Sequence, residues 1–330
     1  MDPDSRASDT RKRDTRADTT HTNSSPNDST AESPPTTAER DTGPGTVGAL
    51  LALIQPTFLA PAVAMAIAGS VLAPSIDPSV LVLHATAVGL AVYVAHLRDA
   101  LVDRFVREEE SGGGTSPTAL RAALVATSLV FLAAVIGLYM RVGPIAVVAT
   151  GPLWLLAIVH APYLDTGPIG VTVDYAVGVA ITILGGYVLQ TAALPPGIVA
   201  TAAVYVLVLS AVKVSVDGLD REFDRSIGKR TIHVAVGSPM ADRLAAGLLG
   251  LAGIVTITVS VIGTLPTAAA LSVVGLGIAA GAVFVRPRRR SVRIQIACVY
   301  PFSAVYLGGA CLGMTSVCGR TVTAVLSAVG

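Results

Sequence analysis

AHLRDALVD at residues 95–103 and VDGLDREFD at residues 216–224 are the two stretches around which this sequence is organised. In both stretches, metal-ligand-type side chains recur at spacings of three and then four residues: His96, Asp99 and Asp103 in the first, and Asp217, Asp220 and Asp224 in the second. Each member of the first set precedes its counterpart in the second by 121 positions. A spacing repeated at one fixed separation indicates that the chain has two related halves.

The composition around these stretches is typical of a membrane protein. Of the 330 residues, 52% are apolar and only 14% are charged, and the mean hydropathy is +0.67. A soluble domain carries about a quarter charged residues. The composition therefore excludes a soluble enzyme, a secreted disulfide scaffold and, at a net charge of +1, a nucleic-acid-binding protein. The cysteines at 298, 311 and 318 lack metal-ligand spacing and are predicted to be small packing residues.

Apolar runs long enough to cross a bilayer recur from Val47 onward. Turn residues such as Gly143-Pro144 separate them. The second acidic stretch lies four helices after the first, so we expect an all-α membrane bundle of about nine transmembrane helices, built from two four-helix repeats and a ninth helix. The expected spans are 47–73, 79–98, 118–140, 143–161, 173–191, 196–214, 242–263, 266–285 and 295–316.

Three regions follow from this pattern. Residues 1–46 are polar and are predicted to form a disordered tail, because they cannot bury enough apolar surface to offset the entropy of ordering. Residues 47–316 form the transmembrane domain, and residues 317–330 a short C-terminal segment.

The loops predict an orientation in the cell membrane. The loops after the second, sixth and eighth helices carry most of the charge, and the last of them is a cluster of arginines at residues 286–293. The positive-inside rule places these loops, both acidic stretches and the N-terminus in the cytoplasm, and the C-terminus outside.

The acidic stretches indicate a site for a metal ion and a diphosphate. Positions i, i+3 and i+7 share one face of a helix, and carboxylates crowded at a membrane boundary repel one another unless a cation lies between them. Mg²⁺ prefers carboxylate, phosphate and water oxygens. Nearby cationic side chains that suit phosphate oxygens are Arg98, Lys213, Arg221 and Lys229. The alternative is that these are ordinary charges where helices leave the membrane.

The second stretch resembles the Asp-x-x-Asp-x-x-x-Asp motif of the UbiA superfamily of intramembrane prenyltransferases. Residues 228–237, GKRTIHVAVG, are similar to the conserved continuation of that motif, and APYLDTGP at 161–168 is similar to the family's loop after the fourth helix. The first stretch departs from the family pattern: Ala95 replaces an asparagine and His96 an aspartate, and Asp165 stands where a basic residue is common.

The resemblance implies a nine-helix bundle around a central cavity that transfers an isoprenyl group to a lipophilic or amphiphilic acceptor. It implies Mg²⁺ bound by Asp99, Asp103, Asp220 and Asp224, with Asp217 completing the second motif. His96 and Tyr163 occupy positions expected to bind substrate. Geranylgeranyl diphosphate is one candidate donor, and the acceptor stays unidentified.

Two other functions compete with this one. A non-catalytic protein that binds an isoprenyl diphosphate would tolerate the altered first motif. A small-molecule transporter would also be a polytopic bundle, but inverted repeats and charges near the bilayer midplane are typical of transporters. Here an even number of helices separates the two motifs, so both halves have the same orientation.

Overall fold

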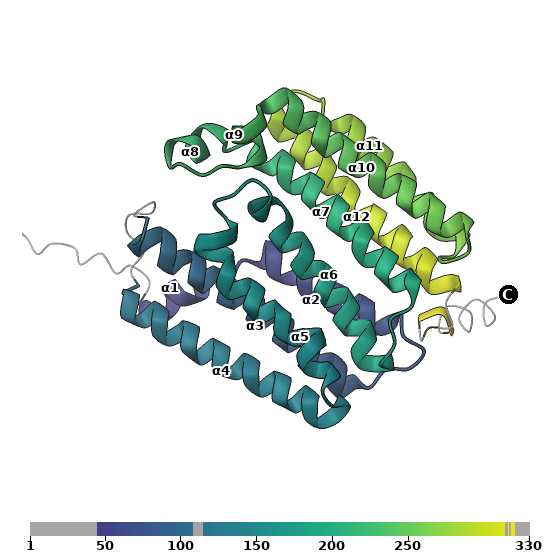
Figure 1. Ribbon diagram of the computed structural model, residues 1–330, viewed down its shortest axis with the longest axis horizontal. Coiled ribbons are helices and arrows are strands. Elements are labelled where there is room, and N and C mark those ends of the chain that lie inside the picture. The colour runs from purple at the N-terminus through teal and green to yellow at the C-terminus, as the bar shows by residue number, and fades with distance from the viewer. Residues whose placement is uncertain (1–44, 108–114, 314–315, 317, 321–330) are drawn as a thin grey trace, which may run out of the picture. The chain divides into compact units, whose positions relative to one another are not determined.

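The computed structural model describes residues 45–107, 115–313, 316 and 318–320 of the chain. All of the predicted disordered tail except Gly45 and Thr46, where α1 begins, and most of the predicted C-terminal segment lie outside these residues, so both stay predictions. Within the described residues the secondary structure is helical and contains no strand. Figure 1 shows the arrangement of the elements, which in chain order are α1 (Thr46–Ala52), α2 (Pro56–Val71), α3 (Pro78–Phe105), α4 (Pro117–Val142), α5 (Ile145–Val159), the π-helical turn His160–Leu164, α6 (Gly170–Thr191), α7 (Pro196–Asp217), α8 (Arg221–Ser226), α9 (Ile232–Val236), α10 (Ser238–Val261), the 3₁₀ turn Thr267–Ser272, α11 (Val273–Ala282) and α12 (Arg288–Gly313).

The all-helical membrane bundle is confirmed, but the count of nine transmembrane helices is not. Seven helices in the described part of the chain are long and apolar enough to cross a membrane. Helices α1 and α2 are bent by 59° relative to each other at a break before Pro56. They add an eighth membrane-spanning segment only if the pair together forms one span. The eighth expected span, 266–285, holds only the shorter apolar helix Thr267–Ala282, which starts as a 3₁₀ turn after Pro266.

Helix packing repeats between the two halves of the chain. In the first half α3 packs on α4, and in the second half α7 packs on α10. The last helix of each half packs on the helix that follows it: α5 packs on α6, and α11 packs on α12. Helices α2 and α6, which begin the two halves, pack on each other, and α6 also packs on α7 (Figure 1). These equivalent helix contacts are the ones expected for two four-helix repeats followed by a further helix.

The contact between α2 and α6 depends on small residues. A Cβ atom added at Gly186 would lie 2.4 Å from the carbonyl oxygen of Ala66, and one added at Gly69 would lie 2.2 Å from that of Ile183. The Ser70 hydroxyl also donates to the Gly186 carbonyl across the helix pair, at 3.1 Å. The two helix backbones therefore approach too closely for any other residue at these positions.

Replacing Gly186 by alanine is expected to destabilise the protein by about 1–3 kcal/mol, because the backbones must separate to accept one methyl group. Gly247→Ala is the matched control, since a Cβ at Gly247 meets nothing within 4 Å. Thermal unfolding in detergent compares the two variants. Equal melting temperatures would contradict the close α2–α6 contact.

A buried polar cluster joins α9, α10 and α12. Asp242 accepts hydrogen bonds from Arg288 at 2.8 and 3.1 Å and from Arg286 at 2.9 Å. The Arg288 guanidinium also donates to His233 Nε2 at 3.2 Å, so His233 is a neutral acceptor in this cluster. Burial first, and the positive charge of Arg288 second, lower the pKa of His233 to about 4.

The His233 shift predicts a loss of stability in mild acid. Its unfolded-state pKa lies near 6.5, so between pH 6.5 and 4 the unfolded chain binds a proton that the folded protein excludes. The melting temperature is therefore expected to fall by several degrees between pH 7 and pH 4. In His233→Gln, which cannot titrate, the fall is expected to be smaller, and an equal fall in the variant would contradict this origin.

The cysteine prediction is wrong for two of the three residues. Cys311 and Cys318 form a disulfide at the C-terminal end of α12, and Cys298 is free. Two cysteines seven residues apart across the end of a helix do not form a recognised sequence motif. The sequence therefore could not distinguish two cysteines that only pack from two that form a disulfide.

Candidate active site

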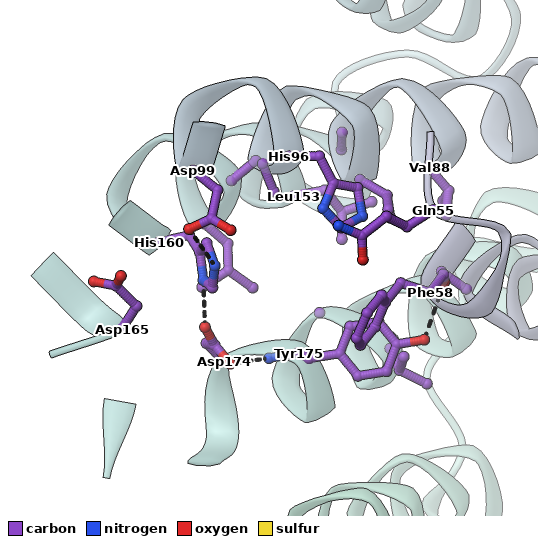
Figure 2. A pocket seen from close by; sticks show the side chains of 18 of the residues that line it. Gln55, Phe58, Val88, His96, Asp99, Leu153, His160, Asp165, Asp174 and Tyr175 are labelled. Atoms are coloured by element: carbon purple, nitrogen blue, oxygen red, sulfur yellow. Dashed lines mark hydrogen bonds and ion pairs between the residues drawn. The ribbon is translucent and has the colours of Figure 1, made fainter. Parts of the chain in front are cut away.

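A cavity of about 280 Å³ lies between α2, α3, α5 and α6 (Figure 2). One part of its wall is polar and carries carboxylates, imidazoles and lysines. The remainder is apolar or aromatic, with α2 contributing Phe58 and α3 contributing Val88. The residues that line it are Gln55, Phe58, Ala62, Val88, Ala91, Val92, Ala95, His96, Asp99, Leu153, Leu156, Ala157, His160, Asp165, Val171, Asp174, Tyr175, Gly178, Val179, Thr182, Lys213 and Lys229.

The first acidic stretch forms the last turns of α3, as its spacing predicts. His96 and Asp99 line the cavity from one face of this helix. The opposite face is apolar, and Leu97 and Leu101 on it pack in a core cluster with α4. His96 Nε2 is buried and has no hydrogen-bond partner among the described residues. The amphipathic end of α3 therefore directs polar groups of the first motif into the cavity.

Arg107, just beyond α3, ties the first motif to the loop that follows the π-helical turn. Its guanidinium makes a bidentate ion pair with Asp165, at 2.5 and 2.8 Å, and donates to Asp103 at 3.1 Å. The Asp165 side chain is only 3% exposed. A buried carboxylate requires such a partner, which explains how an aspartate is accommodated where the family resemblance predicts a basic residue.

The residues present can hold Mg²⁺. Asp99, Asp103 and Asp165 each offer a carboxylate oxygen, and these oxygens lie within 4.8 Å of one another. Carboxylate oxygens are the ligands that Mg²⁺ prefers. Asp103 and Asp165 are also the partners of Arg107, so an ion bound there would share these carboxylates with the guanidinium.

The second acidic stretch does not share one helix face, so this expectation is wrong. Helix α7 ends at Asp217, Asp220 is the N-cap residue of α8, and Asp224 lies within α8. The chain turns at Gly218, where a Cβ would lie 2.5 Å from the Arg288 guanidinium and 2.7 Å from His233 Nε2. The buried polar cluster therefore packs directly against the turn that separates these aspartates.

The aspartates of the second stretch differ in environment. Asp217 is buried and makes an ion pair with Lys213, one helical turn before it. Asp220 is exposed. Burial raises the pKa of Asp224, and the positive charge of Lys229 opposes the shift without cancelling it. Lys213 and Lys229 reach the cavity wall, whereas none of the three aspartates is among its described lining residues.

Three other predicted residues lie away from the cavity wall. Arg98 donates to the carbonyl of Ala161 at 3.0 Å, and Arg221 donates to the carbonyl of His233 at 3.1 Å. Tyr163 is 70% exposed and does not line the cavity. Arg98 therefore stabilises the position of the π-helical turn, and Arg221 that of α9.

The sequence interpretation assigned no chemistry to His160. The α-helix α5 ends at Val159, and the π-helical turn, with a non-helical Ala161, carries His160 at its start. The His160 imidazole lies between Asp174 of α6 and Asp99 of α3, with Nδ1 2.5 Å from Asp174 Oδ2 and Nε2 3.8 Å from Asp99 Oδ1 (Figure 2). Asp174 lies 14 residues after His160, a separation that follows no helical periodicity, so the sequence pattern does not pair the two residues.

The fold is that of intramembrane prenyltransferases of the UbiA type. No family model and no curated protein matches the chain. A digeranylgeranylglyceryl phosphate synthase superposes with a TM-score of 0.61 at 15% identity, covering 83% of this chain and 99% of that one. A UbiA homologue from Archaeoglobus fulgidus bound to GPP and Mg²⁺ gives 0.59 at 16% identity, covering 78% and 99%. A UbiA homologue from Aeropyrum pernix K1 gives 0.59 at 16% identity, covering 77% and 96%.

Proposed function

We propose that this protein transfers an isoprenyl group from an isoprenyl diphosphate to a lipophilic or amphiphilic acceptor within the membrane. One observation carries the proposal: a single cavity joins a wall of carboxylates and lysines to an apolar interior between membrane-spanning helices. A diphosphate needs the first environment and an isoprenyl chain the second. The fold shared with UbiA homologues, one of them bound to GPP and Mg²⁺, supports this reading.

The polar wall would bind the diphosphate. Lys213 and Lys229 reach the cavity and supply positive charge for phosphate oxygens. The oxygen donors for Mg²⁺ would be Asp99 and Asp103 with Asp165, and Asp220 and Asp224 would complete the site from the second motif. When bound, the ion supplies charge that stabilises the departing diphosphate.

The apolar wall would bind the isoprenyl chain and exclude water. Phe58 and Tyr175 stack edge to face at 5.3 Å between ring centroids, and the Tyr175 hydroxyl donates to the Phe58 carbonyl at 3.1 Å. These rings present π faces and edges near the polar wall, where an allylic cation would form and would be stabilised by the ring quadrupole. Geranylgeranyl diphosphate stays one candidate donor.

The orientation proposed for the membrane places the acidic motifs in the cytoplasm. The disulfide at Cys311–Cys318 supports it, because disulfides persist in oxidising compartments. The disulfide lies at the far end of α12 from Arg288, which contacts the turn of the second motif. Arg320, close to the disulfide, donates to the carbonyl of Pro74, near the start of α3. The C-terminus would then lie outside the cell and the exposed arginines of 286–293 inside.

The test is release of diphosphate from isoprenyl diphosphates of several chain lengths by the purified protein, with a membrane lipid extract as the source of acceptors. We expect release to require Mg²⁺, to be lost in Asp220→Ala, and to produce a new prenylated mass. Binding of the diphosphate without turnover would favour the non-catalytic binder. Neither binding nor turnover would contradict the diphosphate site and reopen the transporter alternative.

A further inference from the structure

A second cavity, of about 330 Å³, lies where the last turns of α3, the first turns of α4 and the π-helical turn meet. Helices α3 and α4 pack side by side along this part of the bundle (Figure 1). The residues that line the second cavity are Arg98, Leu101, Val102, Phe105, Val106, Arg121 and Pro162. None of these residues is among those that line the candidate active site.

The two cavities use different faces of α3. Arg98, Leu101 and Phe105 recur at spacings of three and then four residues, which places them on one face of the helix. At 100° per residue, Arg98 points about 160° away from His96, which lines the candidate active site. The second cavity is therefore a separate site at the same end of the bundle as the acidic motifs.

The second cavity collects positive charge that no carboxylate neutralises. Arg98 reaches it from α3 and Arg121 from α4, and neither makes an ion pair with any residue that the structure describes. Arg98 uses Nε to donate to the carbonyl of Ala161 at 3.0 Å, which is a neutral partner. Two guanidinium groups that face one partly apolar cavity repel each other, and a bound anion would remove that repulsion.

The surroundings of the two arginines are apolar and exposed. Phe105 and Val106 are exposed at the edge of the second cavity. From Arg121 an exposed stripe continues along α4 at spacings of three and four residues, through Val125, Leu129 and Leu132. Helix α4 is long and apolar enough to cross the membrane. The stripe therefore offers an apolar path that begins at a pair of positive charges.

We infer that the second cavity binds the headgroup of an anionic phospholipid, with Arg98 and Arg121 on the phosphate and one acyl chain along the exposed stripe of α4. A guanidinium suits the geometry of phosphate oxygens, and basic pockets between membrane helices recognise anionic headgroups. A free anion would use only the arginines, whereas a phospholipid uses the arginines and the apolar stripe. This inference does not depend on prenyl transfer.

Quenching of tryptophan fluorescence by brominated lipids tests this site directly. Trp154 is the only tryptophan of the sequence, so Trp154→Phe gives a silent background. In this background Val125→Trp places a sensor on the stripe, and Ile254→Trp places a control on the exposed face of α10. The full chain is reconstituted in phosphatidylcholine. The measured quantity is the affinity for dibrominated phosphatidylglycerol relative to dibrominated phosphatidylcholine at each sensor.

The Val125→Trp sensor is expected to prefer phosphatidylglycerol by at least about fivefold, the scale of one arginine near an anionic lipid. The Ile254→Trp control is expected to show a ratio near one. Adding Arg98→Gln and Arg121→Gln to the sensor variant is expected to bring its ratio close to that of the control. Adding Arg290→Gln and Arg293→Gln, which remove two exposed charges of α12, is expected to leave the ratio unchanged.

Arg121→Gln alone keeps the test valid if loss of Arg98 disturbs the π-helical turn. Arg121 is exposed and has no hydrogen bond to the described residues, so this variant is expected to fold normally and to lower the ratio at least about twofold. Inorganic phosphate, compared with chloride at equal ionic strength, is expected to leave the ratio of the sensor unchanged.

Four results would each overturn the inference. The first is equal quenching by both lipids at the Val125→Trp sensor, and the second is a preference that survives loss of both Arg98 and Arg121. The third is an equal fall when Arg290 and Arg293 are replaced, which would assign the preference to general surface charge. The fourth is loss of the preference in phosphate but not in chloride, which would assign the second cavity to a free anion.

Discussion

Replacing Asp99 by asparagine is expected to lower Mg²⁺-dependent diphosphate release by at least about 100-fold. Even residues that only orient a metal ligand contribute about 10–100-fold to metal affinity or activity, and Asp99 is the residue of the first motif whose carboxylate lines the cavity. It also belongs to the group of three carboxylates whose oxygens lie within 4.8 Å of one another. Asparagine keeps the shape of the side chain and removes the charge.

The measurement is the rate of diphosphate release as a function of Mg²⁺ concentration, with Glu222→Gln as the control. Glu222 is an exposed carboxylate within the second acidic stretch, and it pairs with Arg221 and Arg225. The Asp99 variant is expected to need more Mg²⁺ and to stay slow at saturation, whereas the control follows the wild type. An Asp99 variant with wild-type rates would place the metal site elsewhere in the protein.

Replacing Arg107 by leucine is expected to destabilise the protein by about 3–5 kcal/mol, the usual cost of breaking a buried ion pair on one side. The change leaves Asp165 buried without the guanidinium that contacts both of its oxygens. It also separates the end of α3 from the loop after the π-helical turn, because Arg107 links Asp165 to Asp103.

Thermal unfolding in detergent tests this expectation. Arg225→Leu is the control, because Arg225 pairs with Glu222 and both side chains are at least half exposed. Exposed pairs contribute about 0–1 kcal/mol. The double variant Arg107→Leu/Asp165→Leu removes both charges, so it is expected to lose less than Arg107→Leu alone. A small effect in Arg107→Leu, equal to that of the control, would show that Asp165 does not depend on the guanidinium.

Local sequence patterns predicted most of the helices and the first acidic face. Apolar runs separated by Pro and Gly place α3, α4, α6, α7 and α10 near their observed bounds, because each pattern is completed within one helix. The spacing of His96 and Asp99 places both on the cavity face of α3 for the same reason. Two expectations were wrong where distant residues decide: Gly218 turns the chain against Arg288 and His233, and Cys311 bonds to Cys318.

The histidine–carboxylate pair of the site could not be predicted from a repeat or a spacing. His160 and Asp174 belong to different helices and meet because the π-helical turn directs one side chain toward α6. Arg107 and Asp165 are 58 positions apart and meet through the packing of α3 on that turn. Such a pair can be recognised only when both charged residues are known to be buried. A hydropathy pattern does not show that a single polar residue in a loop is buried, so the sequence does not reveal the pair.

The most direct test of the proposed function is an experimental structure of the full chain with geranyl diphosphate and Mg²⁺. We expect the diphosphate between Asp99 and the two lysines, Lys213 and Lys229, with the ion bound to Asp99 and the chain of the ligand along Phe58, Val88 and Val179. Density for the ligand outside this cavity, or a cavity that stays empty at saturating ligand, would contradict the proposed function.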